Sequence, residues 1–217
     1  MAGPMIEDDK SIMKLTQRDE EILRFINEFG YCDIAQLMVR FELKKTWMYR
    51  LVQRLVLEKL VRYFPVLNSR HRIYCLTSKG ATYTDLPPID RVTVGQYRHH
   101  VALVYVYLKL RKQYPSMEWV SERRLMQEKF SNGLGKRGHV ADGLLILQEG
   151  KKIAIEVEIS VKAKYKIEKI LREYCTQLTI KEVWYYCSRP VLPTLTMLAA
   201  KIPFVKIFRL DDFLNAK

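Results

Sequence analysis

The chain lacks the features that mark zinc-ribbon, disulfide-rich and membrane-spanning proteins. Its four cysteines are scattered and no two of them form a CxxC pair, so neither a thiolate zinc site nor a disulfide framework is predicted. No apolar run approaches the roughly 20 residues that cross a bilayer. The acidic start MIEDDK is not typical of a signal peptide. We therefore expect a cytoplasmic protein with reduced thiols and no membrane insertion.

Internal repeats, low-complexity segments and a phosphate-binding P-loop are also missing. The glycine-rich stretch SNGLGKRG (131–138) contains GLGK, but its spacing differs from that of a P-loop and no helix follows it directly. A mobile basic loop lying against DNA is enough to explain the stretch. Lys136 and Arg137 are the cations that such a loop would supply.

Acidic residues are few relative to basic ones, with 24 Asp and Glu against 37 Lys and Arg, and the net charge is +13. A basic balance of this size favours a polyanionic partner, most often nucleic acid. A merely soluble basic protein would carry the same charge, so composition alone leaves both readings open. The 217 residues, 48% of them hydrophobic, suffice for one medium domain or two small ones.

The first part of the sequence predicts three helices followed by a β-hairpin. Residues 1–14 are polar and expected to be flexible. Thr16 and Gly30 bound the first predicted helix, Asp33 caps the second, and the third spans 45–60. The segments VRYFPV and HRIYCL are strand-like and are separated by a turn. This order predicts a winged helix-turn-helix over residues 15–86.

The third predicted helix and the hairpin tip carry the residues expected to contact DNA. The helix would lie in the major groove and the tip would contact phosphate or the minor groove. A winged helix used for protein contacts is the alternative. The candidate DNA-binding residues of this region are Lys44, Lys45, Trp47, Arg50, Arg54, Arg70, His71 and Arg72.

Residues 87–94 contain proline and no periodicity, and they are predicted to be a linker. The remainder, 95–217, reads as a helix, three strands, a helix, a strand, and then a further helix and strand. This alternation predicts an α/β/α sandwich around a mixed sheet. The chain as a whole is therefore expected to be an α/β protein of two domains.

Residues 139–166, HVADGLLILQEGKKIAIEVEISVKAKYK, place acids inside apolar strands. The period of two puts Glu156 and Glu158 on one face of the second strand, and Asp142 lies on the strand before it, across a hairpin. Carboxylates that lie this near to one another repel, and a bound cation would stabilise their charged forms. Mg²⁺ or Mn²⁺ held by Asp142, Glu156 and Glu158 would serve a metal-dependent nuclease.

A phosphodiesterase also needs a cation near the phosphate, and further groups to orient the reactants. Lys162 is expected to supply that cation from the first turn of the following helix, with Lys166 one turn on. Glu122 is a further candidate ligand or orienting residue. His139 is close to Asp142 in sequence, whereas His99 would have to reach the site across the fold.

Each of these residues also has a plain structural explanation. Asp142 precedes Gly143 and fits a turn, the two glutamates fit the exposed face of an edge strand, and the lysines fit a solvated helix face. The joint pattern favours a site, because the acids are embedded in hydrophobic strands.

At these residues the chain resembles the PD-(D/E)XK nuclease superfamily, as a variant with Glu158 where the motif has lysine. The resemblance implies that Lys162 takes over from that lysine. The wider layout is similar to the replication-relaxation family and to MobC-type plasmid mobilization relaxases. The motifs that carry this similarity are His99 at a helix start, EWVSERRL, HVADG, IEVEISVK and Tyr174.

This resemblance implies a restriction-endonuclease-like second domain and metal-dependent, site-specific nicking at a plasmid origin of transfer. It also implies relaxosome partners, namely an accessory mobilization protein and a coupling protein. The attacking group would be water or a tyrosine. The leading hypothesis is thus a DNA-nicking endonuclease. The alternative is a non-catalytic DNA-binding regulator or plasmid replication accessory protein on a nuclease-like fold.

Overall fold

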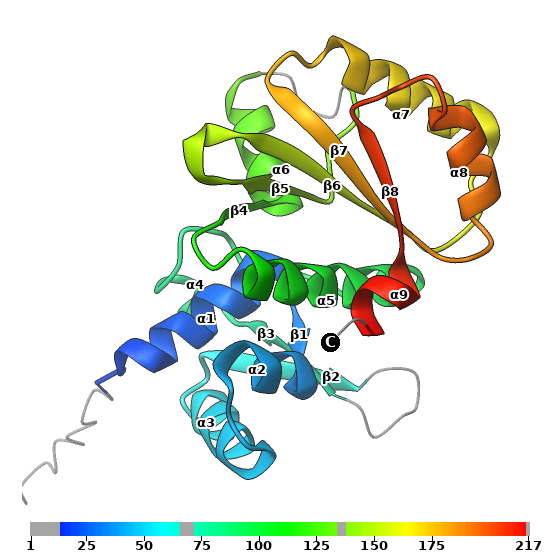
Figure 1. Cartoon of the computed structure of the whole chain (residues 1–217). Coiled ribbons are helices and arrows are strands. Elements are labelled where there is room, and N and C mark those ends of the chain that lie inside the picture. The colour runs from blue at the N-terminus through cyan, green and yellow to red at the C-terminus, as the bar shows by residue number, and fades with distance from the viewer. Residues whose placement is uncertain (1–13, 66–71, 134–137, 216–217) are drawn as a thin grey trace, which may run out of the picture.

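The computed structural model describes residues 14–65, 72–133 and 138–215, and Figure 1 shows how their helices and strands are arranged. The stretch expected to be flexible, 1–14, therefore lies outside the described residues apart from Lys14. The hairpin tip with Arg70 and His71 and the loop residues Lys136 and Arg137 also lie outside them.

The N-terminal part forms the predicted winged helix-turn-helix. Its three strands pair antiparallel in the order β1-β3-β2. The elements are α1 (Gln17–Phe29), β1 (Cys32–Asp33), α2 (Ile34–Phe41), α3 (Lys45–Leu57), β2 (Val61–Pro65), β3 (Arg72–Leu76) and α4 (Ser78–Ala81).

Local sequence signals fix the starts of the first two helices. Thr16 caps α1 and forms a capping box with Asp19, and Asp33 does the same for α2 with Gln36. Gly30 ends α1 with a φ of 85°, a conformation that glycine adopts without strain. Helix α3 ends at Leu57 and not at residue 60, because Lys59 turns the chain with a φ of 58°.

The C-terminal part is a five-stranded mixed sheet with the sequential order β4-β5-β6-β7-β8. The β4–β5 and β5–β6 pairs are antiparallel, whereas β6–β7 and β7–β8 are parallel. Its elements are α5 (Tyr97–Gln113), β4 (Glu118–Ser121), α6 (Glu122–Ser131), β5 (Gly143–Ile146), β6 (Lys152–Glu158), α7 (Lys164–Thr176), β7 (Ile180–Cys187), α8 (Leu192–Ala199), β8 (Val205–Arg209) and α9 (Leu210–Asn215).

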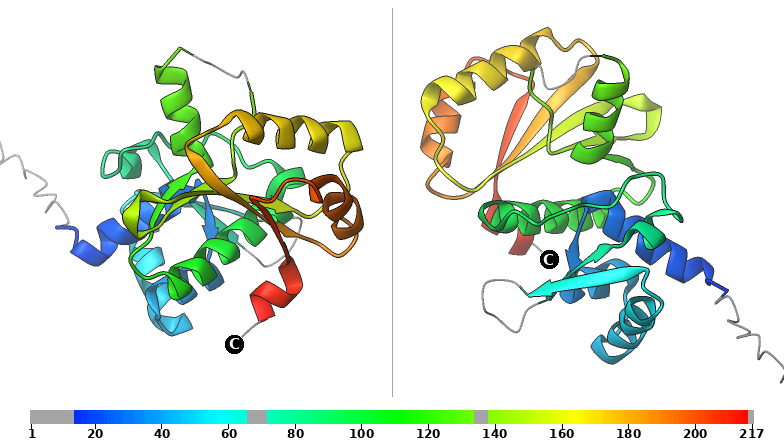
Figure 2. Two further views of the ribbon diagram at one scale, coloured as in Figure 1. Left: turned by 45° about the horizontal axis from the view of Figure 1, so that its top comes forward. Right: turned by 180° about the vertical axis from the view of Figure 1, so that it is seen from behind.

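The period of two in β6 sends alternate side chains to two separate cores. Ile153, Ile155 and Val157 join the cluster that contains α5 and α9, whereas Ala154 joins the cluster under α7 and α8. Figure 2 shows helices on both faces of the sheet. The alternation predicted from the sequence is therefore confirmed, although β6 is buried on both faces.

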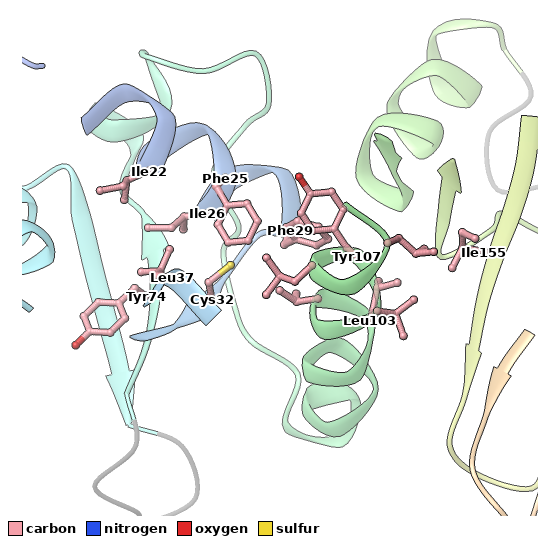
Figure 3. Close-up of a cluster of buried hydrophobic side chains, with 14 of the residues drawn as sticks. Ile22, Phe25, Ile26, Phe29, Cys32, Leu37, Tyr74, Leu103, Tyr107 and Ile155 are labelled. Atoms are coloured by element: carbon pink, nitrogen blue, oxygen red, sulfur yellow. The ribbon is translucent and has the colours of Figure 1, made fainter. Parts of the chain in front are cut away.

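Helix α5 joins the two parts of the chain through one continuous core. Phe25 and Phe29 of α1 pack with Tyr107 of α5, and Leu103 faces Ile155 of the sheet (Figure 3). One side of α5 thus packs against the winged helix, and its other side packs against the sheet.

The segment predicted as a linker has no helix or strand up to residue 93 but is anchored to both parts. The Arg62 side chain donates to the carbonyl of Ile89 (2.7 Å), and Arg123 of α6 donates to that of Pro87 (2.5 Å). Because backbone carbonyls of the segment bind side chains on each side, it fixes the two parts together. No helix among the described residues is long and apolar enough to cross a membrane.

Candidate functional site

An open cleft of about 640 Å³ lies where the winged helix, the anchored segment (residues 87–94) and one end of the sheet meet. Glu122, Asp142, Glu158 and Lys162 line it from the sheet side. Arg91, Arg98, His99 and His100 are among the residues that line it from the segment and from α5. The cleft therefore brings carboxylates and cations together from elements far apart in sequence.

Asp142 lies at the entry of β5 and is held by two groups. The backbone N–H of Val157 donates to its Oδ2 (2.7 Å), and His99 Nε2 lies 3.1 Å from the same oxygen. Burial alone would lower the pKa of His99, but the hydrogen bond and charge of Asp142 outweigh it and raise the pKa. His99 does reach across the fold, because α5 packs over β6.

Glu156 is buried, with a relative exposure of 5%, and is not among the residues that line this cleft. Its Oε1 accepts hydrogen bonds from His139 Nε2 (2.6 Å) and from the Tyr174 hydroxyl of α7. Burial raises the pKa of Glu156, and burial together with the Glu156 charge raises that of Tyr174. Burial opposes a proton on His139, yet its bond to Glu156 raises the pKa of the imidazole.

Glu158 pairs with Lys162, and the pair closes one side of the cleft. Burial would lower the pKa of Lys162, but the bond to Glu158 outweighs it and raises the pKa. Lys162 lies in the connection before α7, which begins at Lys164, and not in the first helical turn as predicted. Lys166 is exposed on α7.

Glu122 opens α6 and faces the same cleft as Asp142. Its backbone N–H donates to the carbonyl of Asp142 (3.3 Å), which links the end of β4 to the start of β5. Burial, followed by the charge of Asp142, raises the pKa of the Glu122 carboxyl.

The acids gather at one end of the sheet but are bonded separately. Asp142 binds His99, Glu156 binds His139 and Tyr174, and Glu158 binds Lys162. Within the described ranges no group of three His, Cys, Asp or Glu side chains is placed to hold a metal ion. The donors as arranged therefore do not fit a three-ligand ion site.

The winged helix presents a second candidate surface. Lys44, Lys45, Trp47 and Arg50 are exposed at the start of α3, and Arg72 is exposed at the start of β3. Arg54, also predicted to contact DNA, is paired with the fully buried Asp19 of α1. Its guanidinium thereby ties α3 to α1, a role that the sequence did not predict.

Several residues of these two surfaces had not been singled out in the sequence. Tyr49 and Tyr63 are exposed beside basic side chains. Arg91 and Arg98 line the cleft. The two tyrosines could have been identified from the sequence, because each is an aromatic residue within a basic stretch. The two arginines carry no such signal, because their position depends on how the anchored segment packs.

No protein-family model matches the chain, and no curated protein matches it. Among solved structures, it is similar to a MarR cysteine mutant from E. coli complexed with operator DNA, with 16% identity and a TM-score of 0.31, covering 55% of this chain and 74% of that one. It is also similar to ZitR of Lactococcus lactis, a zinc-responsive MarR family member, with 16% identity and a TM-score of 0.31 over 61% of this chain and 82% of that one. Similarities at this level do not place the chain in a family.

Proposed function

We propose that this chain is a DNA-binding protein whose α3 helix contacts the duplex. The observation that carries the proposal is the exposed basic start of α3 in a winged helix, on a chain with a net charge of +13. No acidic residue occurs between Lys44 and Leu57 to offset this charge. A DNA-contacting helix of this kind is sufficient for a non-catalytic regulator or a replication accessory protein.

The two cations on the helix face serve different parts of the contact. Arg50 is centrally placed on the exposed side of α3, where a guanidinium can bind a base edge or a phosphate. Lys45, at the helix start, suits the phosphate backbone. Contacts to the phosphate backbone position the protein on the duplex but do not distinguish one base sequence from another.

A double variant with Lys45→Ala and Arg50→Ala should bind duplex DNA at least about tenfold more weakly, because each lost phosphate contact removes counterion release. The dependence of log Kd on log salt should become shallower by about one to two units. Fluorescence anisotropy on one labelled duplex at several salt concentrations measures both.

The matched control is Lys181→Ala with Arg189→Ala, which removes the same charge from exposed positions of the C-terminal part. This control should change affinity by less than about threefold, since only the long-range field is altered. An equal loss in both double variants, or none in the first, would contradict the assignment of α3.

Phosphodiester cleavage at the cleft is the second candidate function. The favouring observation is that Glu122, Asp142, Glu158 and Lys162 share one cleft with Arg91 and Arg98. The arginines could bind a phosphate bidentately and Lys162 could stabilise its charge. The resemblance to mobilization relaxases makes an origin of transfer the expected target and relaxosome proteins the expected partners. The carboxylates as arranged do not fit a metal ion, so the proposed roles are those of the chain's own side chains.

The unmodified protein should nick supercoiled plasmid carrying its cognate origin, assayed both with and without Mg²⁺ or Mn²⁺, and Asp142→Asn should reduce nicking to background. Asparagine is isosteric and can still accept the Val157 N–H, so the fold and duplex affinity should be kept. Agarose gels measure nicking and anisotropy measures binding. Tight binding without nicking by the unmodified protein would exclude cleavage and leave the DNA-binding proposal intact.

A further inference from the structure

A second pocket, of about 280 Å³, lies at the seam between the winged helix and the C-terminal part. Four of the residues that line it are aromatic, namely Phe25 and Phe29 of α1, Tyr107 of α5 and Trp119 of β4. Figure 3 shows the first three of these lying together. The rings of Tyr107 and Trp119 meet edge to face, with centroids 5.2 Å apart. Among the described residues, this pocket shares only Phe29 with the lining of the cleft, so it is a separate site.

Two arginines of this pocket, Arg40 of α2 and Arg111 of α5, have no hydrogen-bond or ion-pair partner among the described residues. Both side chains are half-buried. Arg40 Cζ lies 5.0 Å from the ring centroid of Phe41 and 5.8 Å from that of Phe25, and the Arg40 Nε–H is buried without an acceptor. An arginine can lay its stem on an apolar surface, but a buried N–H group ordinarily has an acceptor.

The other half-buried arginines in the described part of the chain all have an acceptor. These acceptors are Asp19 for Arg54, the Ile89 carbonyl for Arg62, Asn27 for Arg123 and Glu28 for Arg124. The two exceptions line one pocket. This coincidence points to an acceptor that comes from outside the chain.

The acids that line the pocket do not serve its two unpaired arginines. Glu28 is bound by Arg124 Nε (2.7 Å), and Glu21 accepts a hydrogen bond from within α1 (3.2 Å). A third arginine of the pocket, Arg24, is exposed and pairs with Glu20 (3.1 Å). The pocket therefore combines aromatic walls with two guanidinium groups that no carboxylate of the described residues neutralises.

We infer that this pocket binds a small aromatic carboxylate, with its ring against the aromatic walls and its carboxylate bound by Arg40 and Arg111. Guanidinium groups bind carboxylates through pairs of N–H donors, and aromatic rings pack favourably in offset or edge-to-face arrangements. A volume of about 280 Å³ is at the lower end for ligand pockets, so one ring with one carboxylate suits it. The inference does not depend on DNA binding.

Benzoate is the probe, titrated into the full chain and followed by ligand-observed NMR. It should bind with a Kd below about 1 mM, which a ligand of this size can reach. Benzamide keeps the ring without the charge, and acetate keeps the charge without the ring, so each should bind at least about tenfold more weakly. Equally tight binding of acetate or inorganic phosphate would indicate a simple ion site and overturn the inference, as would no binding of benzoate.

Substitutions of the two arginines test where the probe binds. Arg111→Gln should weaken benzoate binding at least about tenfold because a charge-assisted contact is lost, whereas Arg111→Lys should weaken it less because the charge is kept. Arg40→Gln tests the same contact from α2, and thermal melts of each variant check the fold. Arg172→Gln, which removes a guanidinium from the exposed side of α7, is the matched control and should change the Kd by less than about threefold.

Tryptophan emission gives a second readout. Benzoate should change the emission of the unmodified chain, and Trp119→Phe should abolish that change, since Trp47 and Trp184 are not among the residues that line the pocket. A change that persists in Trp119→Phe would place the probe elsewhere and overturn the inference. Unaltered affinity in folded Arg40→Gln and Arg111→Gln, or an equal loss in Arg172→Gln, would do the same.

Discussion

Replacing Gly143 by alanine should lower the melting temperature by about 10 °C. A Cβ at this position would lie 2.1 Å from Cζ2 and 2.3 Å from Cη2 of Trp119. The indole has little room to withdraw, because it packs against Tyr107 (5.2 Å between ring centroids) and Phe29 (6.3 Å). Forcing an extra methyl into such a site costs about 3 kcal/mol, and a chain of this size loses roughly 2–4 °C per kcal/mol.

Differential scanning calorimetry with two further variants tests the cause. Gly95→Ala is the matched control, since a Cβ there meets nothing within 4 Å, and it should not lower the melting temperature. Trp119→Phe removes the outer indole atoms and should recover at least about 1 kcal/mol in the Gly143→Ala background, as coupled neighbours do. Additive effects of the two substitutions would show that the clash is not the reason.

The Gly143 position also bears on the cleft. Asp142 precedes it directly, and its carboxylate is held by the N–H of Val157 on the neighbouring strand. Any shift of β5 that relieves the clash moves Asp142 relative to β6. Gly143→Ala should therefore weaken the Asp142–His99 contact as well as the fold.

Lowering the pH from 7 to 5 should destabilise the protein by about 2 kcal/mol through His100 alone. The pKa of His100 is lowered from 6.5 to about 4, mainly by burial and in smaller part by the nearby charges of His99 and Arg123, against the hydrogen bond to Tyr31. Its Nε2–H donates to the Tyr31 carbonyl (2.8 Å) and its ring stacks on that of Tyr31, with centroids 3.8 Å apart.

The sign follows from the two states. The unfolded chain takes up a proton on this side chain near pH 6.5, whereas the folded chain resists until about pH 4. The contribution of neutral His100 is therefore complete above pH 6.5 and is lost as the pH falls towards 4. His99 and His139 have raised pKa values, so their contributions have the opposite sign and fade as the pH rises above 6.5.

Urea unfolding at pH 7, 6 and 5 separates these effects. His100→Gln keeps an N–H for the Tyr31 carbonyl but does not titrate, so it should lose about 2 kcal/mol less than the unmodified protein between pH 7 and 5. His139→Gln is the control, because it should leave the difference due to His100 in place. Parallel pH profiles for the unmodified protein and His100→Gln would refute the burial argument.

Local patterns in the sequence determined much of this protein. The capping residues Thr16 and Asp33 set the first two helix starts, and the order of helices and hairpin predicted the winged helix. The alternation around Glu156 and Glu158 predicted one strand with both acids on one face. These signals are local, since each depends on residues within a few positions of one another.

The tertiary structure alone decided what each charged group binds. His99 meets Asp142 across 43 positions, Tyr174 reaches Glu156 across 18, and Arg54 pairs with Asp19 across 35. Such partners depend on how helices pack over the sheet, which no local period encodes. The sequence brought the three carboxylates to one end of the sheet, whereas the donor that each of them meets depends on packing, because a buried charge must be paired wherever the fold leaves it.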